Sequence, residues 1–172
     1  MTRLDAIYLL VTGAATARRV PELIEGLAGI VPNLVTVLTP NARQVVSPRE
    51  LAMTPGHQII ESYFDESILP RPADGVVLVA PCTFNSLNKL AQGIADNLAL
   101  SIAAEAIGRD TPVVVAVSVN LPLWKHPRTK ESVETLRIWG VEVIEPVSDG
   151  DYLTMAENAV LVDAVKRKLK AD

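Results

Sequence analysis

The chain has 172 residues and a net charge of -4, and 49% of its residues are hydrophobic although only 4% are aromatic. This length is typical of one domain, which we expect to span residues 1–172. Small and branched aliphatic residues supply nearly all of the apolar mass, which favours helices packed on a parallel sheet. Lys and Arg are scattered until the segment 166–170, so no basic stripe predicts nucleic acid as a partner.

The residues available for metal or thiol chemistry are few. Cys82 is the single cysteine, so the chain has no internal disulfide, and the two histidines, His57 and His126, are far apart in sequence. We therefore expect no metal site, and ordinary surface or loop positions for both histidines. The apolar stretch 7–17 is too short to span a bilayer and does not resemble a signal peptide, so we expect a cytoplasmic protein without membrane contact.

Short apolar runs bounded by turn residues recur along the chain and do not alternate with polar residues, which is typical of strands covered on both faces. They lie at 6–11, 34–38, 75–80, 112–117 and 141–144. The segments between them carry helical spacing at 20–27, 98–108, 133–140 and 155–169. This alternation predicts an α/β fold with a doubly wound parallel sheet and helices on both faces.

One long segment, residues 52–73, has no sustained period. Loops of that length within compact domains are often functional. Ligands of doubly wound sheets bind beyond the carboxyl ends of the strands, so the residues that follow each strand are candidates for a site.

Two of these strand ends could bind an anion. Gly13 permits a tight turn after the first strand, where free backbone N–H groups open the next helix, although a simple turn is equally plausible. After the second strand, Thr39 and Asn41 either donate hydrogen bonds to the same anion or cap the following helix.

The other two strand ends carry amide and aromatic side chains. The third strand is expected to end at Pro81, followed by a polar turn and a helix that carries Asn85, Asn88 and Asp96. After the fourth strand, Ser118 and Asn120 lead into a loop that holds Trp124, which either anchors packing or covers a ligand. The chain has no Gly-rich dinucleotide fingerprint, Walker lysine or cluster of metal ligands.

Four segments make the chain resemble the flavoprotein superfamily of homo-oligomeric flavin-containing cysteine decarboxylases, which includes phosphopantothenoylcysteine decarboxylases and lantibiotic peptidyl-cysteine decarboxylases. The sequences "PCTFNS" and "KLAQGIADNL" match the family patterns P-A-S-A-N-T and K-x-A-x-G-I-x-D-N-L. The segment "VSVNLPLW" keeps the Asn and Trp of the family's substrate clamp, P-x-M-N-x-x-M-W, as Asn120 and Trp124. "TGAATA" resembles the family's phosphate turn, and the resemblance extends over roughly residues 5–147.

This resemblance implies a three-layer, flavodoxin-like (Rossmann-like) fold that binds FMN. It assigns the FMN phosphate to Gly13, Ala14 and Thr39, and the flavin ring to the segment 83–85. That segment consists of Thr83, Phe84 and Asn85. The resemblance also implies a homo-oligomer, a trimer or dodecamer, with FMN near the subunit contacts.

The family's chemistry is the oxidative decarboxylation of a cysteine to an enethiol, for which the resemblance assigns the substrate to Asn120 and Trp124. The family's catalytic histidine lies fourteen residues before the motif proline, a count that reaches Ser67 here, with Glu66 beside it and no histidine nearby. We therefore name Asn120, Glu66 and Ser67 as the catalytic candidates. A carboxylate such as that of Glu66 can act as a base, whereas a solvated acidic loop is the alternative.

The resemblance also bears on the choice of substrate. Phosphopantothenoylcysteine decarboxylases use a flap cysteine that the segment 145–159 lacks, so we expect a C-terminal peptidyl cysteine or a similar small thiol acid. Cys82 occupies a position where the family has a small residue, which argues against a nucleophile. The alternatives are a non-catalytic FMN-binding or regulatory subunit and, third, a protein like the flavin prenyltransferases, whose phosphate turn has a Gly and a Ser that "TGAAT" lacks.

Overall fold

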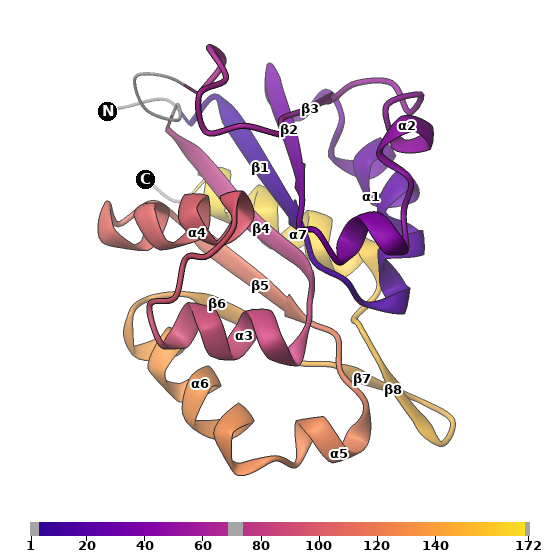
Figure 1. The fold of residues 1–172 in the computed structure, drawn as a ribbon, viewed down its shortest axis with the longest axis vertical. Coiled ribbons are helices and arrows are strands. Elements are labelled where there is room, and N and C mark those ends of the chain that lie inside the picture. Colours follow the sequence, from indigo (N-terminus) through magenta and orange to yellow (C-terminus); the bar gives the residue numbers. More distant parts are fainter. Residues whose placement is uncertain (1–3, 69–73, 171–172) are drawn as a thin grey trace.

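The computed structural model describes residues 4–68 and 74–170, which form a six-stranded parallel sheet in the order β3-β2-β1-β4-β5-β6 (Figure 1). Its strands are β1 (Ala6–Val11), β2 (Asn33–Leu38), β3 (Gln58–Ile59), β4 (Gly75–Cys82), β5 (Val113–Val117) and β6 (Glu142–Ile144). Without the two-residue β3, this is the strand order of flavodoxin-like sheets. The expected fold class is confirmed.

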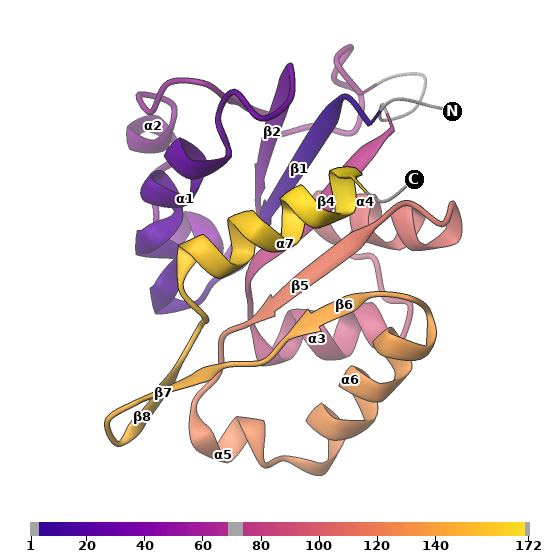
Figure 2. The same ribbon diagram turned by 180° about the vertical axis from the view of Figure 1, so that it is seen from behind.

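Helices cover both faces of the sheet (Figures 1 and 2). One face packs against α3 (Phe84–Ala91), α4 (Leu98–Gly108) and α6 (Pro127–Ile138), and the other against α1 (Val20–Leu27) and α7 (Asn158–Lys170). Alternate residues of β1 serve the two cores: Tyr8 and Leu10 lie on the first face, and Ile7 and Leu9 on the second. This double burial explains why the strands read as unbroken apolar runs.

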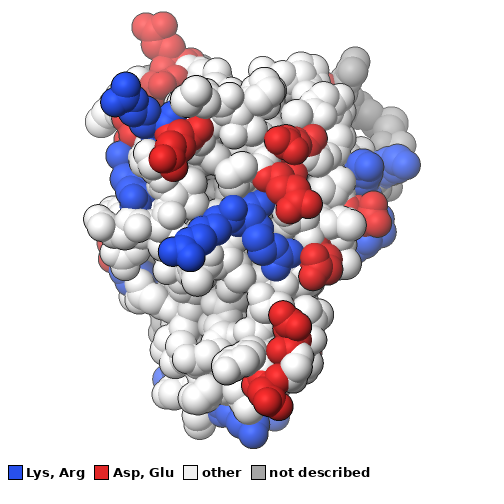
Figure 3. Space-filling model, turned by 90° about the vertical axis from the view of Figure 1, so that its right-hand side faces the viewer, with Lys and Arg blue, Asp and Glu red and all other residues white. Residues whose placement is uncertain are grey.

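Shorter helices follow several strands: η1 (Ala15–Arg19), η2 (Ala42–Gln44), α2 (Pro48–Leu51) and α5 (Leu121–Trp124). Among the described residues, no helix is long and apolar enough to cross a membrane. On the face shown in Figure 3, acidic and basic side chains are interspersed.

Four expectations about where elements begin and end were wrong, and the first three concern β4 and the two segments that follow strands. Strand β4 continues through Pro81 to Cys82, because a register shift against β5 between Val79 and Cys82 accommodates a residue that has no N–H to donate. Asp96 lies in the connection between α3 and α4 rather than on a helix. The segment with Trp124, expected to be a loop, forms α5.

The last helix begins at Asn158 rather than near 155, and Arg19 explains the difference. Its guanidinium donates to the carbonyls of Met155 and Ala156, at 3.0 and 2.8 Å. Asn158 returns a bond from Nδ2 to the carbonyl of Arg19 at 3.1 Å. These carbonyls are therefore bound to η1 instead of starting a helix.

A hairpin of β7 (Val147–Asp149) and β8 (Tyr152–Thr154), which the sequence did not predict, connects β6 to this anchored segment. It projects from the body of the molecule (Figure 2). Its turn contains Gly150 with a φ of +60°, a backbone conformation that favours glycine. Strands of three residues are too short to show a period in the sequence.

Of the long segment 52–73, residues 52–68 are mostly irregular and residues 69–73 lie outside the described part of the chain. It contributes β3 to the sheet edge and then returns beside α4, where the Tyr63 hydroxyl donates to the Glu105 carboxylate. This bond is the first cause of a raised Tyr63 pKa, followed by burial. The bond holds the part of the segment around Tyr63 on the C-terminal half of α4.

Candidate functional site

The chain leaves the adjacent strands β1 and β4 in opposite directions, and this creates the switch point of the sheet. The connection after β1 leads to β2 on one side, and the connection after β4 leads to β5 on the other. The two loops therefore diverge at the carboxyl edge, where doubly wound sheets bind their ligands.

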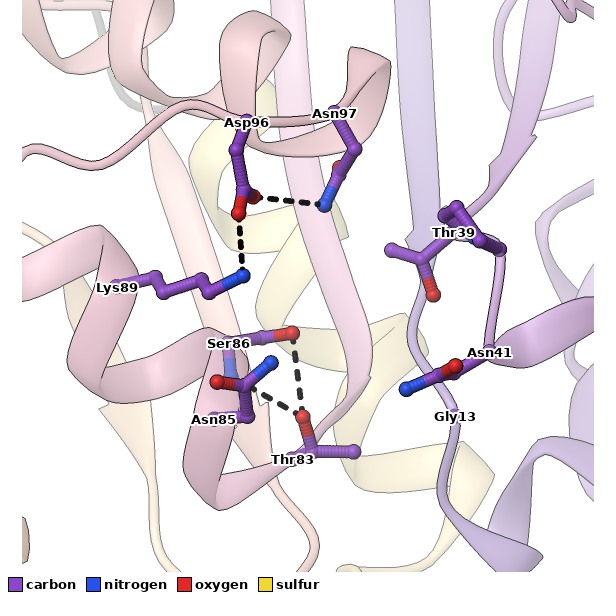
Figure 4. Close-up of a pocket in the computed structure, with 10 residues that line it drawn as sticks. Gly13, Thr39, Asn41, Thr83, Asn85, Ser86, Lys89, Asp96 and Asn97 are labelled. Carbon is purple, nitrogen blue, oxygen red and sulfur yellow. Dashed lines mark hydrogen bonds and ion pairs between the residues drawn. The ribbon is translucent and has the colours of Figure 1, made fainter.

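A pocket of ≈ 300 Å³ lies at this point (Figure 4). It is lined by Gly13, Thr39, Pro40, Asn41, Thr83, Asn85, Ser86, Lys89, Asp96 and Asn97. Four of the predicted cofactor residues, from three separate strand ends, thus lie around one pocket. Ala14 and Phe84 neighbour lining residues in the chain but do not line the pocket themselves, and their roles stay predictions.

The first wall consists of two loops in close contact. A Cβ placed on Gly13 would lie 2.6 Å from the Cβ of Asn41 and 2.9 Å from its carbonyl carbon, so the position has no space for a side chain. Beside it, the buried Thr39 accepts a bond from the N–H of Ala42 at 3.2 Å through its hydroxyl oxygen. The Thr39 hydroxyl thus binds the first N–H of η2 and keeps its own proton to donate, whereas Asn41, the residue before η2, makes no side-chain capping bond.

A buried threonine that the sequence analysis missed joins the two diverging loops. Thr12 is 2% exposed, and its hydroxyl donates to the carbonyl of Pro81 at 2.7 Å while accepting from the N–H of Thr83 at 2.9 Å. It thereby fixes the turn after β4 relative to the end of β1. Its position directly before Gly13, at the end of a strand, was the sequence feature that could have identified it.

The second wall is the start of α3. Thr83 is its N-cap residue, and its hydroxyl accepts from the N–H of Ser86 and donates to the Ser86 hydroxyl, both at 3.1 Å. This places Asn85 in the first turn, where its exposed side chain lines the pocket. The wall therefore offers hydroxyl and amide groups without a net charge.

The third wall contains an ion pair, which the sequence analysis did not predict. Lys89 Nζ lies 2.5 Å from Asp96 Oδ2, and this bond is the main cause of a lowered Asp96 pKa. Asn97 caps α4 through Oδ1, which accepts from the N–H of Leu100 at 3.0 Å. The family motif "KLAQGIADNL" therefore forms a wall of the pocket, in addition to the helix that follows.

The predicted substrate residues do not line the pocket, but the N–H of Ser118, which leads to them, donates to the carbonyl of Cys82 at 2.9 Å. Asn120 caps α5, with Oδ1 accepting from the N–H of Leu123 at 3.0 Å. Trp124 packs partly buried against the core. The ring of Phe84, whose neighbours in the chain line the pocket, contacts His126 edge to face with centroids 5.1 Å apart. This contact connects the segment that follows α5 with the start of α3.

Glu66 and Ser67 do not reach the pocket of their own chain. Both are exposed, and they belong to the segment that lies beside the C-terminal half of α4, toward the amino ends of the strands (Figure 1). The N–H and hydroxyl of Ser67 donate to the carboxylate of Asp65, and these bonds lower the Asp65 pKa. Their catalytic roles stay predictions.

The remaining candidates for proton or thiol chemistry have structural roles. His57 is hydrogen bonded through both ring nitrogens, Nδ1 with the Thr36 hydroxyl at 2.8 Å and Nε2 with the carbonyl of Leu51 at 3.0 Å. Cys82 is fully buried, which raises the pKa of its thiol to about 12. At neutral pH this thiol stays protonated, so it is no nucleophile.

Fold and site together define a flavodoxin-like α/β protein with a polar ligand pocket at the switch point. A model of the family described as Flavoprotein matches residues 1–170. The chain belongs to this family, that of the FMN-dependent cysteine decarboxylases.

Curated relatives agree with this assignment. The chain is 32% identical over 178 residues to the phosphopantothenoylcysteine decarboxylase of Mus musculus, covering 92% of this chain and 84% of the relative. It is 28% identical over 170 residues to a coenzyme A biosynthesis bifunctional protein, CoaBC, of Thermococcus kodakarensis, covering 95% of this chain. The chain spans 42% of the length of that bifunctional relative.

Solved structures share the fold. A variant of PPC decarboxylase in complex with pantothenoylaminoethenethiol superposes with a TM-score of 0.82 at 23% identity, over 98% of this chain and 100% of that one. The FMN-dependent cysteine decarboxylase SpaF gives a TM-score of 0.80 at 27% identity, over 96% of this chain and 98% of that one.

Proposed function

We propose that this chain binds FMN in the switch-point pocket and oxidatively decarboxylates a cysteine to an enethiol. The observation that carries the proposal is the convergence of Gly13, Thr39, Thr83 and Asn85 on one pocket. Backbone, hydroxyl and amide groups in close approach suit a phosphate and the polar edge of a flavin ring. The donor set of the pocket therefore fits the cofactor.

Within this proposal, Gly13, Ala14 and Thr39 hold the phosphate, and the start of α3 holds the ring. The ring contacts are Thr83, Phe84 and Asn85. FMN supplies the acceptor for two electrons from the substrate. Thr12 acts indirectly, because it keeps the phosphate turn and the start of α3 at a fixed separation.

Asn120 and Trp124 are proposed to hold the substrate. Because the side-chain oxygen of Asn120 accepts from Leu123, its Nδ2 group is left to donate to a carboxylate. Glu66 and Ser67 lie away from the pocket of their own chain, so a catalytic role for them requires a second copy. With such a role, the protein is proposed to act as a homo-oligomer, a trimer or dodecamer, with FMN near the subunit contacts.

The proposed substrate is a peptide that ends in cysteine or a small thiol acid, in a cytoplasmic setting. The segment 145–159, which forms the hairpin and its anchor, contains no cysteine that could reduce an enethiol. Release of the enethiol itself is therefore the proposed outcome.

Binding of FMN is the first expected result. The purified protein should be yellow, or apoprotein should quench the fluorescence of added FMN at a stoichiometry of one per chain. A colourless protein that leaves the fluorescence of added FMN unchanged would contradict the proposal. Riboflavin, which lacks the phosphate, is the matched control ligand. Its weaker binding would measure how much the phosphate contributes to the affinity for FMN.

Turnover is the second expected result. Incubation of the FMN-loaded protein with a peptide that ends in cysteine should release CO₂. The mass of the peptide should fall by that of CO₂ and two hydrogen atoms. Asn120→Asp keeps an oxygen that caps α5 but replaces the donor by a negative charge that repels the substrate carboxylate. It should lose turnover by roughly tenfold or more, equivalent to about 1.4 kcal/mol, and keep FMN.

Asn120→Ser is the matched control for helix capping, because the serine hydroxyl accepts the bond from the N–H of Leu123 without adding a negative charge. A protein that binds FMN fully but turns over no cysteine peptide or thiol acid would favour the second candidate, a non-catalytic FMN-binding or regulatory subunit. The observation behind that candidate is Ser67, which stands at the position of the family histidine and is bonded to Asp65.

A further inference from the structure

We infer that the Lys89–Asp96 ion pair sets the reduction potential of the flavin in this pocket. Lys89 favours the negative charge that the flavin gains on reduction, and Asp96 limits that effect. This inference rests on the proposed binding of FMN, and it assigns a role to two residues that the proposed function leaves without one.

Lys89 and Asp96 are the two charged residues among those that line the pocket. Lys89 follows Asn85 by one helical turn, so both side chains lie on the same face of α3. Asp96 lies in the connection to α4, and the bond of 2.5 Å joins the two across that connection. Figure 4 shows the pair on the far side of the pocket from Gly13 and Asn41.

The position of the pair relative to a ligand follows from the other walls. If the phosphate lies at Gly13 and Thr39, the ring lies toward α3, which carries Lys89. In this orientation the ion pair lies on the ring side of the pocket, across from the phosphate turn at Gly13.

Both side chains of the pair are partly exposed. The side chain of Lys89 is 27% exposed and that of Asp96 is 50% exposed, and the bond between them lowers the pKa of the carboxyl group. A ring that displaces water from the pocket lowers the local dielectric constant and strengthens the interaction of both charges with it. Hydride transfer brings two electrons and one proton, so reduction adds one negative charge to the ring.

The direction of each effect follows from charge alone. Removing the positive charge in Lys89→Met leaves Asp96 facing the ring, so the reduced form is bound less tightly relative to the oxidised form and the potential falls. Asp96→Asn leaves Lys89 unneutralised, so the potential rises. The double variant should return toward the wild-type value, because the two charges oppose each other.

The test is spectroelectrochemical titration of the FMN-loaded proteins, which requires no turnover. We expect at least a tenfold change in the ratio of affinities for reduced and oxidised flavin in each single variant, which is about 30 mV for a two-electron couple. Lys89→Arg keeps the charge and should stay near the wild type. Lys130→Met is the matched control, because Lys130 pairs with Glu134 on α6 and does not line the pocket.

The outcomes separate this inference from the proposed function. Wild-type protein that binds no FMN would overturn both. FMN-loaded Lys89→Met and Asp96→Asn whose affinity ratios agree with wild type within about threefold, or shift in the same direction, would overturn the ion-pair inference alone. If Lys89→Met does not retain flavin, the opposite shift expected of Asp96→Asn and the unchanged value of Lys89→Arg still decide it.

Discussion

Gly13→Ala is expected to weaken FMN binding by at least about tenfold, equivalent to roughly 1.4 kcal/mol. The added Cβ would lie 2.6 Å from the Cβ of Asn41, and backbone atoms of Asn41 at 2.9 and 3.1 Å prevent a simple side-chain adjustment. The two loops that form the first wall must move apart, at a cost of about 1–3 kcal/mol in the free energy of unfolding. Fluorescence titration with FMN and thermal unfolding of the apoprotein measure the two effects.

Gly108→Ala is the matched control. Gly108 ends α4 with nothing near the position of a Cβ, and its φ is not positive. Alanine there should leave FMN affinity unchanged and stabilise the helix slightly, by up to about 1 kcal/mol. Wild-type FMN affinity in a folded Gly13→Ala variant would contradict the assignment of this turn to the phosphate.

Thr12→Val is expected to destabilise the protein by about 1–3 kcal/mol, because it leaves the N–H of Thr83 without its hydrogen-bond partner. The carbonyl of Pro81 loses the Thr12 hydroxyl but keeps its bond from the backbone N–H of Thr12 at 3.2 Å. The turn that begins α3 then keeps only this backbone bond to residue 12, so FMN affinity should also fall. Denaturant unfolding and FMN titration are the measurements.

Two substitutions separate the local effect from general destabilisation. Thr12→Ser keeps the hydroxyl and loses one methyl group, so it should retain FMN affinity at a cost of about 0.8 kcal/mol. Thr36→Val removes another buried strand hydroxyl, which bonds to His57 away from the pocket. It should lower stability without changing FMN affinity, and equal losses of affinity in Thr12→Val and Thr36→Val would refute the specific role of Thr12.

The fold was largely predictable because both faces of its strands are buried. Unbroken apolar runs therefore marked β1, β2, β4 and β5 to within one or two residues. The errors arose where tertiary contacts override the local pattern. Arg19 holds the carbonyls before α7, and the register shift lets β4 continue through Pro81. The hairpin and β3 are too short for any periodicity to reveal them.

The lining of the pocket was predictable where a strand end and a turn residue coincide, as at Gly13, Thr39 and Thr83. Sequence reasoning missed Thr12 because its partners, Pro81 and Thr83, are about seventy positions away in the chain, at separations of 69 and 71 residues. The ion pair of Lys89 and Asp96 was hidden for a related reason. Its residues belong to a recognised motif, but their joint position over the pocket depends on the connection between two helices.

The double attachment of Arg19 to the segment 155–158 has a consequence for how this chain tolerates changes in length. The guanidinium fixes the residues that follow the hairpin, so the start of α7 is set by η1 rather than by the route the chain takes from β6. Residues can therefore be inserted or deleted at the hairpin tip without displacing the last helix. The tip is thus the place on the described chain where we would introduce a tag, a label or a second binding segment.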